Sequence, residues 1–420
     1  MTSGERGIEE MLVGLLKASH LMSVDELPAK VAEYAPVAGL LAVDAYVCDL
    51  QESVLRRVTG EGMDAAQGDG DSEFKVEGTL PGRAFQQGEV LPTLRKTQQA
   101  GHYQWWVPFL DGTERLGVLR VTTDANDEQA HTAMQSLAAL MALIIVSKRE
   151  NSDSHARLVR TQEMNVAAEM QWHLMPPRSY ADARVMIAGA MEPAYQVAGD
   201  AFDFAIASDT VHLAIFDAMG HDTAAGLTAN LAMAACRNHR RQGAPLNRIG
   251  EAIEQVLTEQ FADRIRYVTA ILADLDTRTG RLSWVNHGHH PPVIIRGHRW
   301  TNTVHCPPTP PLGVGLGLEA TLCHEQLHPG DRIVLYTDGI TEARSPGGQE
   351  FGLDRFLDFL IRQHADDLPV PETLRRLRHR ILDHHGSNLS DDATVLILEW
   401  HGPTPYPLRE VEALAGLPDQ

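Results

Sequence analysis

The chain has 420 residues, 43% of them hydrophobic, and its 36 Lys and Arg against 56 Asp and Glu give a formal net charge of −20. This length favours two domains, each with enough chain for a sizeable core. The negative charge opposes binding to a nucleic-acid backbone or an anionic membrane surface, so a site that handles phosphate must supply its own cations.

Three features predict a cytoplasmic protein with no membrane segment. Met1 to Glu10 carries charges and lacks the apolar core of a signal peptide. The longest apolar run, Leu137 to Val146, is far shorter than the roughly 20 residues that cross a bilayer. The cysteines have no CxxC spacing, which argues against a disulfide framework or a thiolate zinc site and favours a reducing compartment. They are Cys48, Cys236, Cys306 and Cys323.

Residues 1–147 predict a small α/β domain. Apolar positions at helical spacing alternate with short runs that are typical of strands, and Asp111-Gly112 predicts a hairpin turn. The expected helices are Glu5–Leu16, Asp25–Leu41, Thr79–Phe85 and Asp127–Val146, and the expected strands are Val43–Leu50, Val54–Thr59, Trp105–Leu110 and Leu116–Thr122.

Two stretches of this domain, "LPGRAF" with its following Gly88-Glu89 and the hairpin "WVPFLDGTERLGVLRV", resemble a GAF domain. The resemblance implies a sensor whose cup binds a small ligand or a partner. A GAF-shaped module used only for dimerisation or packing is the alternative. Trp105 and Trp106 fall on opposite faces of their strand, so at least one of them is expected in the core.

Residues 148–177 predict a helical linker. The segment is polar, with apolar residues at near-helical spacing, and the helix should stop at Pro176-Pro177 because proline disrupts helical hydrogen bonding. A helix continuous with the preceding one would suit a two-stranded coiled coil in a homodimer. A surface helix packed on its own domain is the alternative, since the heptad spacing is short and imperfect.

Residues 178–400 predict an α+β domain in which packed sheets are covered by helices, followed by a Pro-rich tail at 401–420. The expected strands are Arg184–Met191, Asp200–Ala207, Val211–Phe216, Tyr267–Leu275, Leu282–Asn286, Val293–Arg296, Ile333–Thr337 and Ala393–Trp400. The expected helices are Thr223–Arg241, Asn247–Phe261, Leu353–His364 and Glu372–His385.

Acidic residues recur at the ends of these predicted strands, namely Asp200, Asp217, Asp338 and Asp391. A buried charge at a strand end is costly unless a cation neutralises it. Carboxylates gathered without cysteine or paired histidine suit Mg²⁺ or Mn²⁺. Because two such ions can polarise a phosphoryl oxygen and activate water near neutral pH, the pattern predicts a phosphate ester as substrate.

Five motifs, in the same order, resemble the SpoIIE/RsbU-type branch of the PPM (protein phosphatase 2C) superfamily. They are Gly199–Asp203, Asp217–Asp222, Asn286–Pro292, Thr337–Ala343 and Asn388–Val395. The helix expected over Glu163 to Pro176 matches as well. The resemblance implies a C-terminal PPM-type β-sandwich flanked by helices, joined here to an N-terminal GAF-like sensor by the linker.

The resemblance also implies roles for the acidic residues. Asp217 bridges two Mn²⁺ or Mg²⁺ ions, and the carbonyl oxygen of Ala218 binds one of them. Asp338 and Asp391 bind the other ion, whereas Asp200 acts mostly through metal-bound water. The implied reaction is in-line attack on phosphorus by a two-metal-activated water, without a phosphoenzyme.

Three departures from the family pattern bear on activity. Ala218 and Asp222 each replace a glycine, and Ala201-Phe202 replaces a pair of tyrosines. None removes a carboxylate, so activity is favoured. His221 could protonate the leaving group, and the alternative is a helix N-terminal residue with no chemical role.

Two further groups of residues are expected to support the site. The histidines of the segment 287–290 are expected in a strand-end loop packed under the site, rather than in a third set of metal ligands. Asp203 and Asp392 are expected beside the ligands or in solvent.

The predicted function is a metal-dependent protein serine/threonine phosphatase regulated by its N-terminal sensor. By resemblance, its substrate is a phosphorylated STAS-domain anti-anti-sigma factor. A catalytically weak PPM-fold scaffold in the same signalling circuit is the alternative, because of Ala218 and Asp222. Hydrolysis of a small phosphate ester or cyclic nucleotide is a third hypothesis. We expect a homodimer, and neither a nucleic acid nor a membrane as partner.

Overall fold

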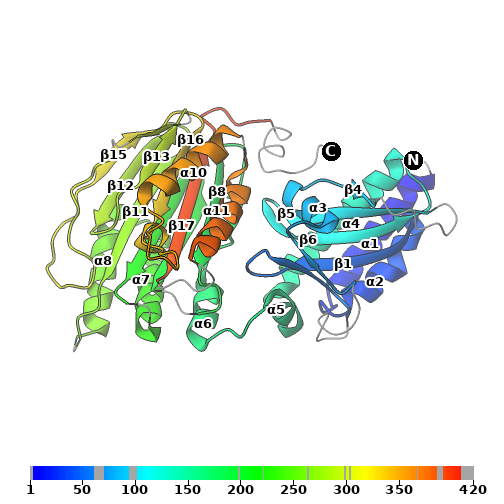
Figure 1. Ribbon diagram of the computed structural model, residues 1–420, viewed down its shortest axis with the longest axis horizontal. Coiled ribbons are helices and arrows are strands. Elements are labelled where there is room, and N and C mark those ends of the chain that lie inside the picture. The colour runs from blue at the N-terminus through cyan, green and yellow to red at the C-terminus, as the bar shows by residue number, and fades with distance from the viewer. Residues whose placement is uncertain are drawn as a thin grey trace. The chain divides into compact units, whose positions relative to one another are not determined.

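The computed structural model divides the chain into two compact units, one ending at Glu163 and the other beginning at Met164 (Figure 1). The structure describes residues 3–60, 71–93, 102–196, 199–220, 222–262, 264–297, 299–301, 304–366, 368–385 and 391–407. Each unit has its own sheet structure and its own apolar core.

The first unit is built on an antiparallel six-stranded sheet with the strand order β3-β2-β1-β6-β5-β4. The predicted hairpin is confirmed, and its Gly112 has a φ of +57°, which glycine adopts without steric cost. Trp105 and Trp106 are both buried, on opposite faces of β5. The strands are β1 Leu40–Cys48, β2 Val54–Arg57, β3 Glu73–Lys75, β4 Leu91–Pro92, β5 Tyr103–Asp111 and β6 Glu114–Thr123.

Helices cover both faces of this sheet. The core on one face takes side chains from α1 Ser3–Ser19, α2 Leu27–Tyr34 and α4 Glu128–Arg149, and α3 Leu80–Gln87 packs on the other face. By length and composition alone α4 could cross a membrane, but core helices share this composition and half of its apolar window is buried in the structure.

The linker is not one continuous helix, which corrects the prediction. After α4 the chain forms α5 Asp153–Val159 and, beyond a break, α6 Val166–Leu174. The side chains of Ser152 and Asn165 cap the N-termini of α5 and α6, accepting hydrogen bonds of 3.1 Å and 2.8 Å from backbone N–H groups. The helix does end before Pro176, as expected.

The second unit is a sandwich of two antiparallel sheets, which confirms the α+β prediction. The first sheet has the order β15-β12-β11-β10-β9, and the second has the order β14-β13-β16-β17-β8-β7. The strands are β7 Ser179–Ala181, β8 Val185–Glu192, β9 Asp200–Ala207, β10 Thr210–Ala218, β11 Val268–Asp276, β12 Arg281–His287, β13 Val293–Arg296, β14 Arg299–Thr301, β15 Cys323–Gln326, β16 Asp331–Tyr336 and β17 Ala393–Trp400.

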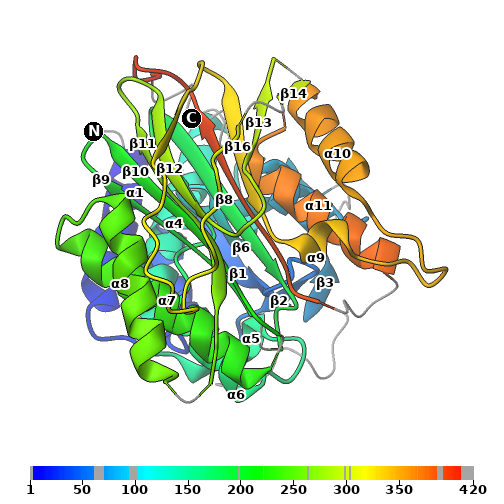
Figure 2. The ribbon, with the colours of Figure 1, turned by 90° about the vertical axis from the view of Figure 1, so that its left-hand side faces the viewer.

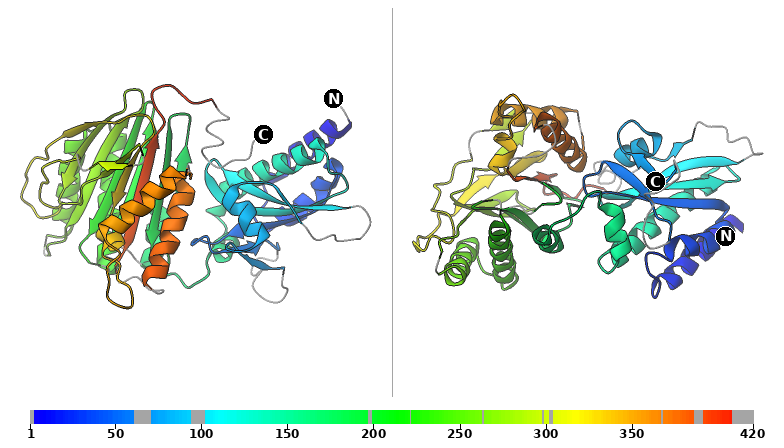
Figure 3. Two further views of the ribbon diagram at one scale, coloured as in Figure 1. Left: turned by 45° about the horizontal axis from the view of Figure 1, so that its top comes forward. Right: turned by 60° about the horizontal axis from the view of Figure 1, so that its bottom comes forward.

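The core of this unit lies between the two sheets, and helices cover the outer faces (Figures 2 and 3). α7 Thr223–Arg241 and α8 Leu246–Gln260 pack on the five-stranded sheet. On the six-stranded sheet, α11 Val370–His385 packs against β8 and β17, next to α10 Leu353–Ala365, and the short α9 Asp338–Thr341 follows β16.

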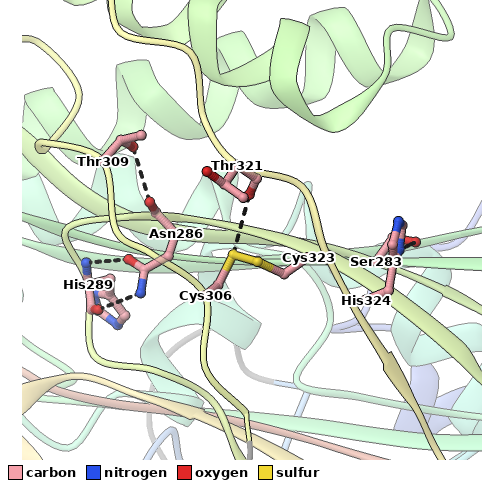
Figure 4. The surroundings of a disulfide bond; sticks show 8 residues. All are labelled: Ser283, Asn286, His289, Cys306, Thr309, Thr321, Cys323 and His324. Atoms are coloured by element: carbon pink, nitrogen blue, oxygen red, sulfur yellow. Dashed lines mark hydrogen bonds between the residues drawn. A yellow bond between two sulfur atoms is a disulfide. The ribbon is translucent and has the colours of Figure 1, made fainter.

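The cysteine prediction was wrong in one respect. Cys306 and Cys323 form a disulfide, with Cα atoms 5.8 Å apart, beside the strand end that carries Asn286 (Figure 4). The bond joins the start of a long connection to the edge strand β15, a proximity that the 17-residue separation did not reveal. The cysteines therefore give no support to a reducing compartment.

Candidate functional site

Asp200 and Asp217 are register partners at the adjacent ends of β9 and β10. Two residues along each strand, Phe202 and Ile215 belong to the core between the sheets. Because side chains alternate along a strand, both carboxyl groups face the space just beyond that core, towards the second sheet.

The second sheet brings further acidic residues to the same place. β16 and β17 are antiparallel neighbours, so Asp338, after β16, and Asp391 with Asp392, before β17, occur at the same end of the sheet. The Thr337 hydroxyl, at the end of β16, donates a 2.6 Å hydrogen bond to the carboxylate of Asp200 and thereby connects the sheets. We call Asp200, Asp217, Asp338, Asp391 and Asp392 the acidic centre.

Charge repulsion and burial act together in the acidic centre. Burial raises the pKa of Asp200 well above its ordinary value, and the charges of Asp217 and Asp392 raise it further. Burial also raises the pKa of Asp217, to about 7, with added contributions from Asp338, Asp391 and Asp392. Full ionisation is therefore unfavourable unless a cation is bound.

His289 packs beneath the acidic centre, as predicted for its loop. Burial lowers the pKa of His289 to about 3, so the ring is neutral. Its Nε2 donates to the carbonyl oxygen of Tyr336 over 3.0 Å, which leaves Nδ1 to accept from the Thr269 hydroxyl over 2.7 Å. Thr269 also hydrogen-bonds the carboxyl group of Asp217, and Asn286 holds the backbone of His289.

Two glycines allow the backbone to close around the centre. A Cβ atom at Gly339 would lie 1.8 Å from the carbonyl oxygen of Asp392, and one at Gly199 would lie 2.7 Å from that of Ala218. The N–H of Gly199 donates to the carboxylate of Asp392. A side chain at either position would therefore displace the segments that carry the acidic residues.

The structure accounts for two of the departures from the family pattern. Ala218 is the last residue of β10 and pairs with Val268, so its backbone is extended and alanine is accommodated without strain. Asp222 caps α7 by accepting a 2.8 Å hydrogen bond from the N–H of Ala225, and a carboxylate is favourable at a helix N-terminus. Arg266 lies 3.7 Å from Asp222.

The donor chemistry of the acidic centre fits a hard divalent cation. Its donors are carboxylate and carbonyl oxygens, and its raised pKa values are those expected where negative charges lack a cation. Within the described ranges, no three His, Cys, Asp or Glu side chains meet in a ready-made coordination shell. The assignment of Asp200, Asp217, Ala218, Asp338 and Asp391 as metal ligands therefore stays a prediction.

The remaining candidates separate in the structure. The buried Asp203 lies away from the centre, because it accepts from Arg237 over 2.7 Å and from Arg240 over 2.6 Å. Asp392 belongs to the centre. The sequence indicates this position, because Asp392 lies four residues before Leu396, a core residue of β17. Side chains alternate along a strand, so both residues point to the same face of the sheet. His221 lies outside the described residues.

The support from Thr337 and Thr269 was not predicted from the sequence. Neither residue type marks a site, and their contacts to Asp200 and Asp217 join segments that are far apart in the chain.

Comparison with known proteins gives the second unit a family. Residues 207–401 match the family described as Stage II sporulation protein E (SpoIIE). Protein IcfG of Synechocystis sp. is 24% identical over 271 residues, which cover 57% of this chain and 41% of that protein. Phosphoserine phosphatase RsbU of Bacillus subtilis is 25% identical over 240 residues, which cover 56% of this chain and 69% of that protein. This chain thus spans only part of either relative.

Among solved structures, the SiaA-PP2C domain of Pseudomonas aeruginosa is 20% identical, with a TM-score of 0.48, over 56% of this chain and 94% of that one. The motifs around the acidic centre and the family match concern the same part of the sequence. The second unit of this chain is therefore a SpoIIE-family domain of the PPM type.

Proposed function

We propose that the second unit is a metal-dependent protein serine/threonine phosphatase. The observation that carries the proposal is the acidic centre, in which burial and the charges of neighbouring aspartates raise the pKa of Asp217 to about 7. Such a concentration of negative charge is suited to holding divalent cations against a phosphate ester. The family match and the relative named as a phosphoserine phosphatase support the same reaction class.

Asp200, Asp217, Asp338, Asp391 and the carbonyl oxygen of Ala218 would hold two Mn²⁺ or Mg²⁺ ions. When bound, the ions would neutralise the carboxylates, polarise the phosphoryl group and activate a water molecule for in-line attack.

The chain's own residues orient these ligands. Thr337 fixes the carboxylate of Asp200. The Thr269 hydroxyl, which is oriented by His289, lies beside the carboxyl group of Asp217. Gly339 permits the close packing of the Asp338 and Asp392 segments. His221 stays a proposed proton donor to the leaving group.

The substrate and the regulation follow from the family resemblance. We propose a phosphorylated STAS-domain anti-anti-sigma factor as substrate, a homodimeric assembly and a cytoplasmic location. The first unit is proposed as the GAF-like sensor. Support comes from its antiparallel sheet with helices on both faces and from a cavity of about 240 Å³ that Asp44, Arg57 and Met141 line.

A catalytically weak scaffold is the second candidate. The observation that favours it is the lack of a ready-made coordination shell within the described residues. On this hypothesis the unit would bind the phosphoprotein without turning it over.

Phosphate release by the purified chain tests both candidates. The assay compares Mn²⁺, Mg²⁺ and EDTA, on a phosphoprotein, p-nitrophenyl phosphate and cyclic nucleotides. The matched variants are Asp338→Asn and Asp358→Asn, since Asp358 is exposed on α10. We expect metal-dependent release that Asp338→Asn abolishes and Asp358→Asn preserves. A folded wild-type chain that releases no phosphate with either metal would overturn the phosphatase and leave the scaffold.

A further inference from the structure

Four exposed apolar side chains of the second unit lie on segments that meet beside the acidic centre. They are Met219, Ile265, Leu316 and Leu318, which are 37%, 73%, 61% and 60% exposed. Side chains that are this exposed add little to the core of their own unit. A group of them beside a functional site is typical of a surface that binds a partner. We call these four residues the apolar rim.

Met219 connects the apolar rim to the acidic centre. It lies two residues after Asp217, so their Cα atoms are at most about 8 Å apart. Its backbone N–H donates to the carbonyl oxygen of Tyr267 over 3.1 Å. Ile265 precedes Tyr267 by two residues, so the segments of Met219 and Ile265 are neighbours at the edge of the acidic centre.

The loop 313–318 is fixed against the same segment. A Cβ atom at Gly313 would lie 2.3 Å from the carbonyl oxygen of Arg266, so the two backbones are in contact. Glu254 of α8 accepts from the N–H groups of Gly313 and Gly315, the latter over 2.7 Å. A surface whose segments are already held in place costs little to order when a partner binds.

The charges beside the apolar rim suit a phosphorylated partner. Arg264 and Arg266 flank Ile265 in the sequence, and Arg264 is exposed. The chain as a whole carries a formal charge of −20 and repels a phosphoprotein, so cations at this point reduce the repulsion close to the acidic centre. The same net charge disfavours an anionic membrane as the partner.

We propose that the apolar rim binds the polypeptide chain of the phosphoprotein on either side of its phosphorylated residue. The proposal rests on the proposed phosphatase function and assigns its substrate class: a protein with apolar side chains near the phosphoserine or phosphothreonine, and not a small phosphate ester. An extended segment of six residues spans about 20 Å, which is enough to cross the rim from the acidic centre. A second copy of this chain bound at the rim would cover the acidic centre, so the rim is assigned to the substrate.

Synthetic phosphoserine peptides test the proposal on the full chain with Mn²⁺. Each peptide has six residues on either side of the phosphoserine, with serine alternating with leucine in one peptide and with alanine in the other. p-Nitrophenyl phosphate measures hydrolysis without any flanking chain. We expect kcat/KM to be about ten-fold higher for the leucine peptide than for the alanine peptide, through a lower KM, because leucine side chains are removed from water at the rim. Equal KM values for the two peptides would overturn the proposal.

A binding measurement separates failure of the rim from failure of the phosphatase. Fluorescence anisotropy of the labelled peptides gives the same comparison of leucine with alanine in a chain that releases no phosphate. Tighter binding of the leucine peptide without turnover would support the rim and contradict the phosphatase. Equal binding of both peptides would overturn the rim whatever the activity.

Variants locate the binding surface. Ile265→Ser and Leu316→Ser should each raise the KM for the leucine peptide several-fold, and leave the alanine peptide and p-nitrophenyl phosphate unchanged. The control is Leu322→Ser, since Leu322 is 48% exposed but lies outside the rim, beside the edge strand β15. Unchanged KM for the leucine peptide in both rim variants would contradict the assigned surface. A smaller assembly of the rim variants in size-exclusion chromatography would assign the rim to a second copy and overturn the proposal.

Discussion

Asp200 and Asp217 face each other across the β9–β10 ladder, each at a strand end and each turned towards the second sheet. Neither pairs with a basic residue in any described ion pair of this sandwich. Their mutual repulsion persists because the ladder and the bond from Thr337 fix them in place. The resulting pKa shifts lead to the first prediction.

Metal-induced stabilisation of the second unit should grow with pH. The pKa of Asp217 is raised from an ordinary 3.8 to about 7, so without metal this group favours folding at low pH. That contribution disappears as the pH rises through the folded pKa, because the folded state must then hold the charge. Metal ligation needs the ionised carboxylate of Asp217, so the stabilisation of the fold by Mn²⁺ should increase as the pH rises through this pKa.

Thermal unfolding with Mn²⁺ and with EDTA, at about pH 5.5 and about pH 7.5, measures this effect. The shift in Tm should be larger at the higher pH. Asp217→Asn should remove most of the shift at both values, and Asp358→Asn should retain it. An equal Mn²⁺ effect at both pH values would contradict the role given to Asp217.

Asp203→Asn should destabilise the second unit because it weakens the contacts of β9 with α7, and not because it changes the acidic centre. The substitution leaves Arg237 and Arg240 near an uncharged partner in a buried setting, which costs about 3–5 kcal/mol. Chemical denaturation measures the loss. The control is Asp209→Asn, whose exposed carboxylate pairs with the partly buried Arg184, and it should cost less than about 1 kcal/mol.

Gly339→Ala should abolish phosphate release and lower stability by about 1–3 kcal/mol, because its Cβ would overlap the carbonyl oxygen of Asp392. The matched control is Gly347→Ala, whose Cβ would meet only Ser345, at 3.7 Å. Phosphate release and thermal unfolding of both variants check the expectation. Wild-type turnover by Gly339→Ala would show that the two acidic segments need not approach so closely.

Reduction of the Cys306–Cys323 disulfide should lower the stability of the second unit by about 3 kcal/mol, the entropic effect expected for a loop of 17 residues. Urea denaturation with and without a reductant measures the difference. Cys306→Ser should match the reduced wild type and should show no further response to reductant. If the reductant did not change the stability of the wild type, the disulfide would contribute nothing to stability in solution.

The sequence predicted most of the elements that carry the site. Strand β9, helix α7, strand β13 and strand β17 have the predicted bounds, because strong apolar periodicity ends there at Gly, Pro or charged residues. The short edge strands β7 and β15 were not predicted. Each forms by pairing with one neighbouring strand, β8 or β12, and that pairing depends on the fold of the whole unit.

Other features depended on contacts that no local pattern shows. The disulfide joins residues whose proximity comes from the fold of a long connection. The bonds of Thr337 and Thr269 to the acidic centre cross from one part of the chain to another. Asp391 was predicted as a ligand and Asp392 only beside the ligands or in solvent, and the structure brings Asp392 into the acidic centre as well.

The end of α6 has a mechanical consequence for the strand that carries Asp200. Gln171 of α6 donates to the backbone carbonyl of Asp200, and Arg237 of α7 bonds both the carbonyl of Leu174 and the carboxylate of Asp203. These hydrogen bonds connect α6 to two points of β9, directly to Asp200 and through Arg237 to Asp203. A displacement of α6 must therefore either break these hydrogen bonds or move β9 with the helix. A pull on the chain that precedes α6 would thus act on the backbone of Asp200.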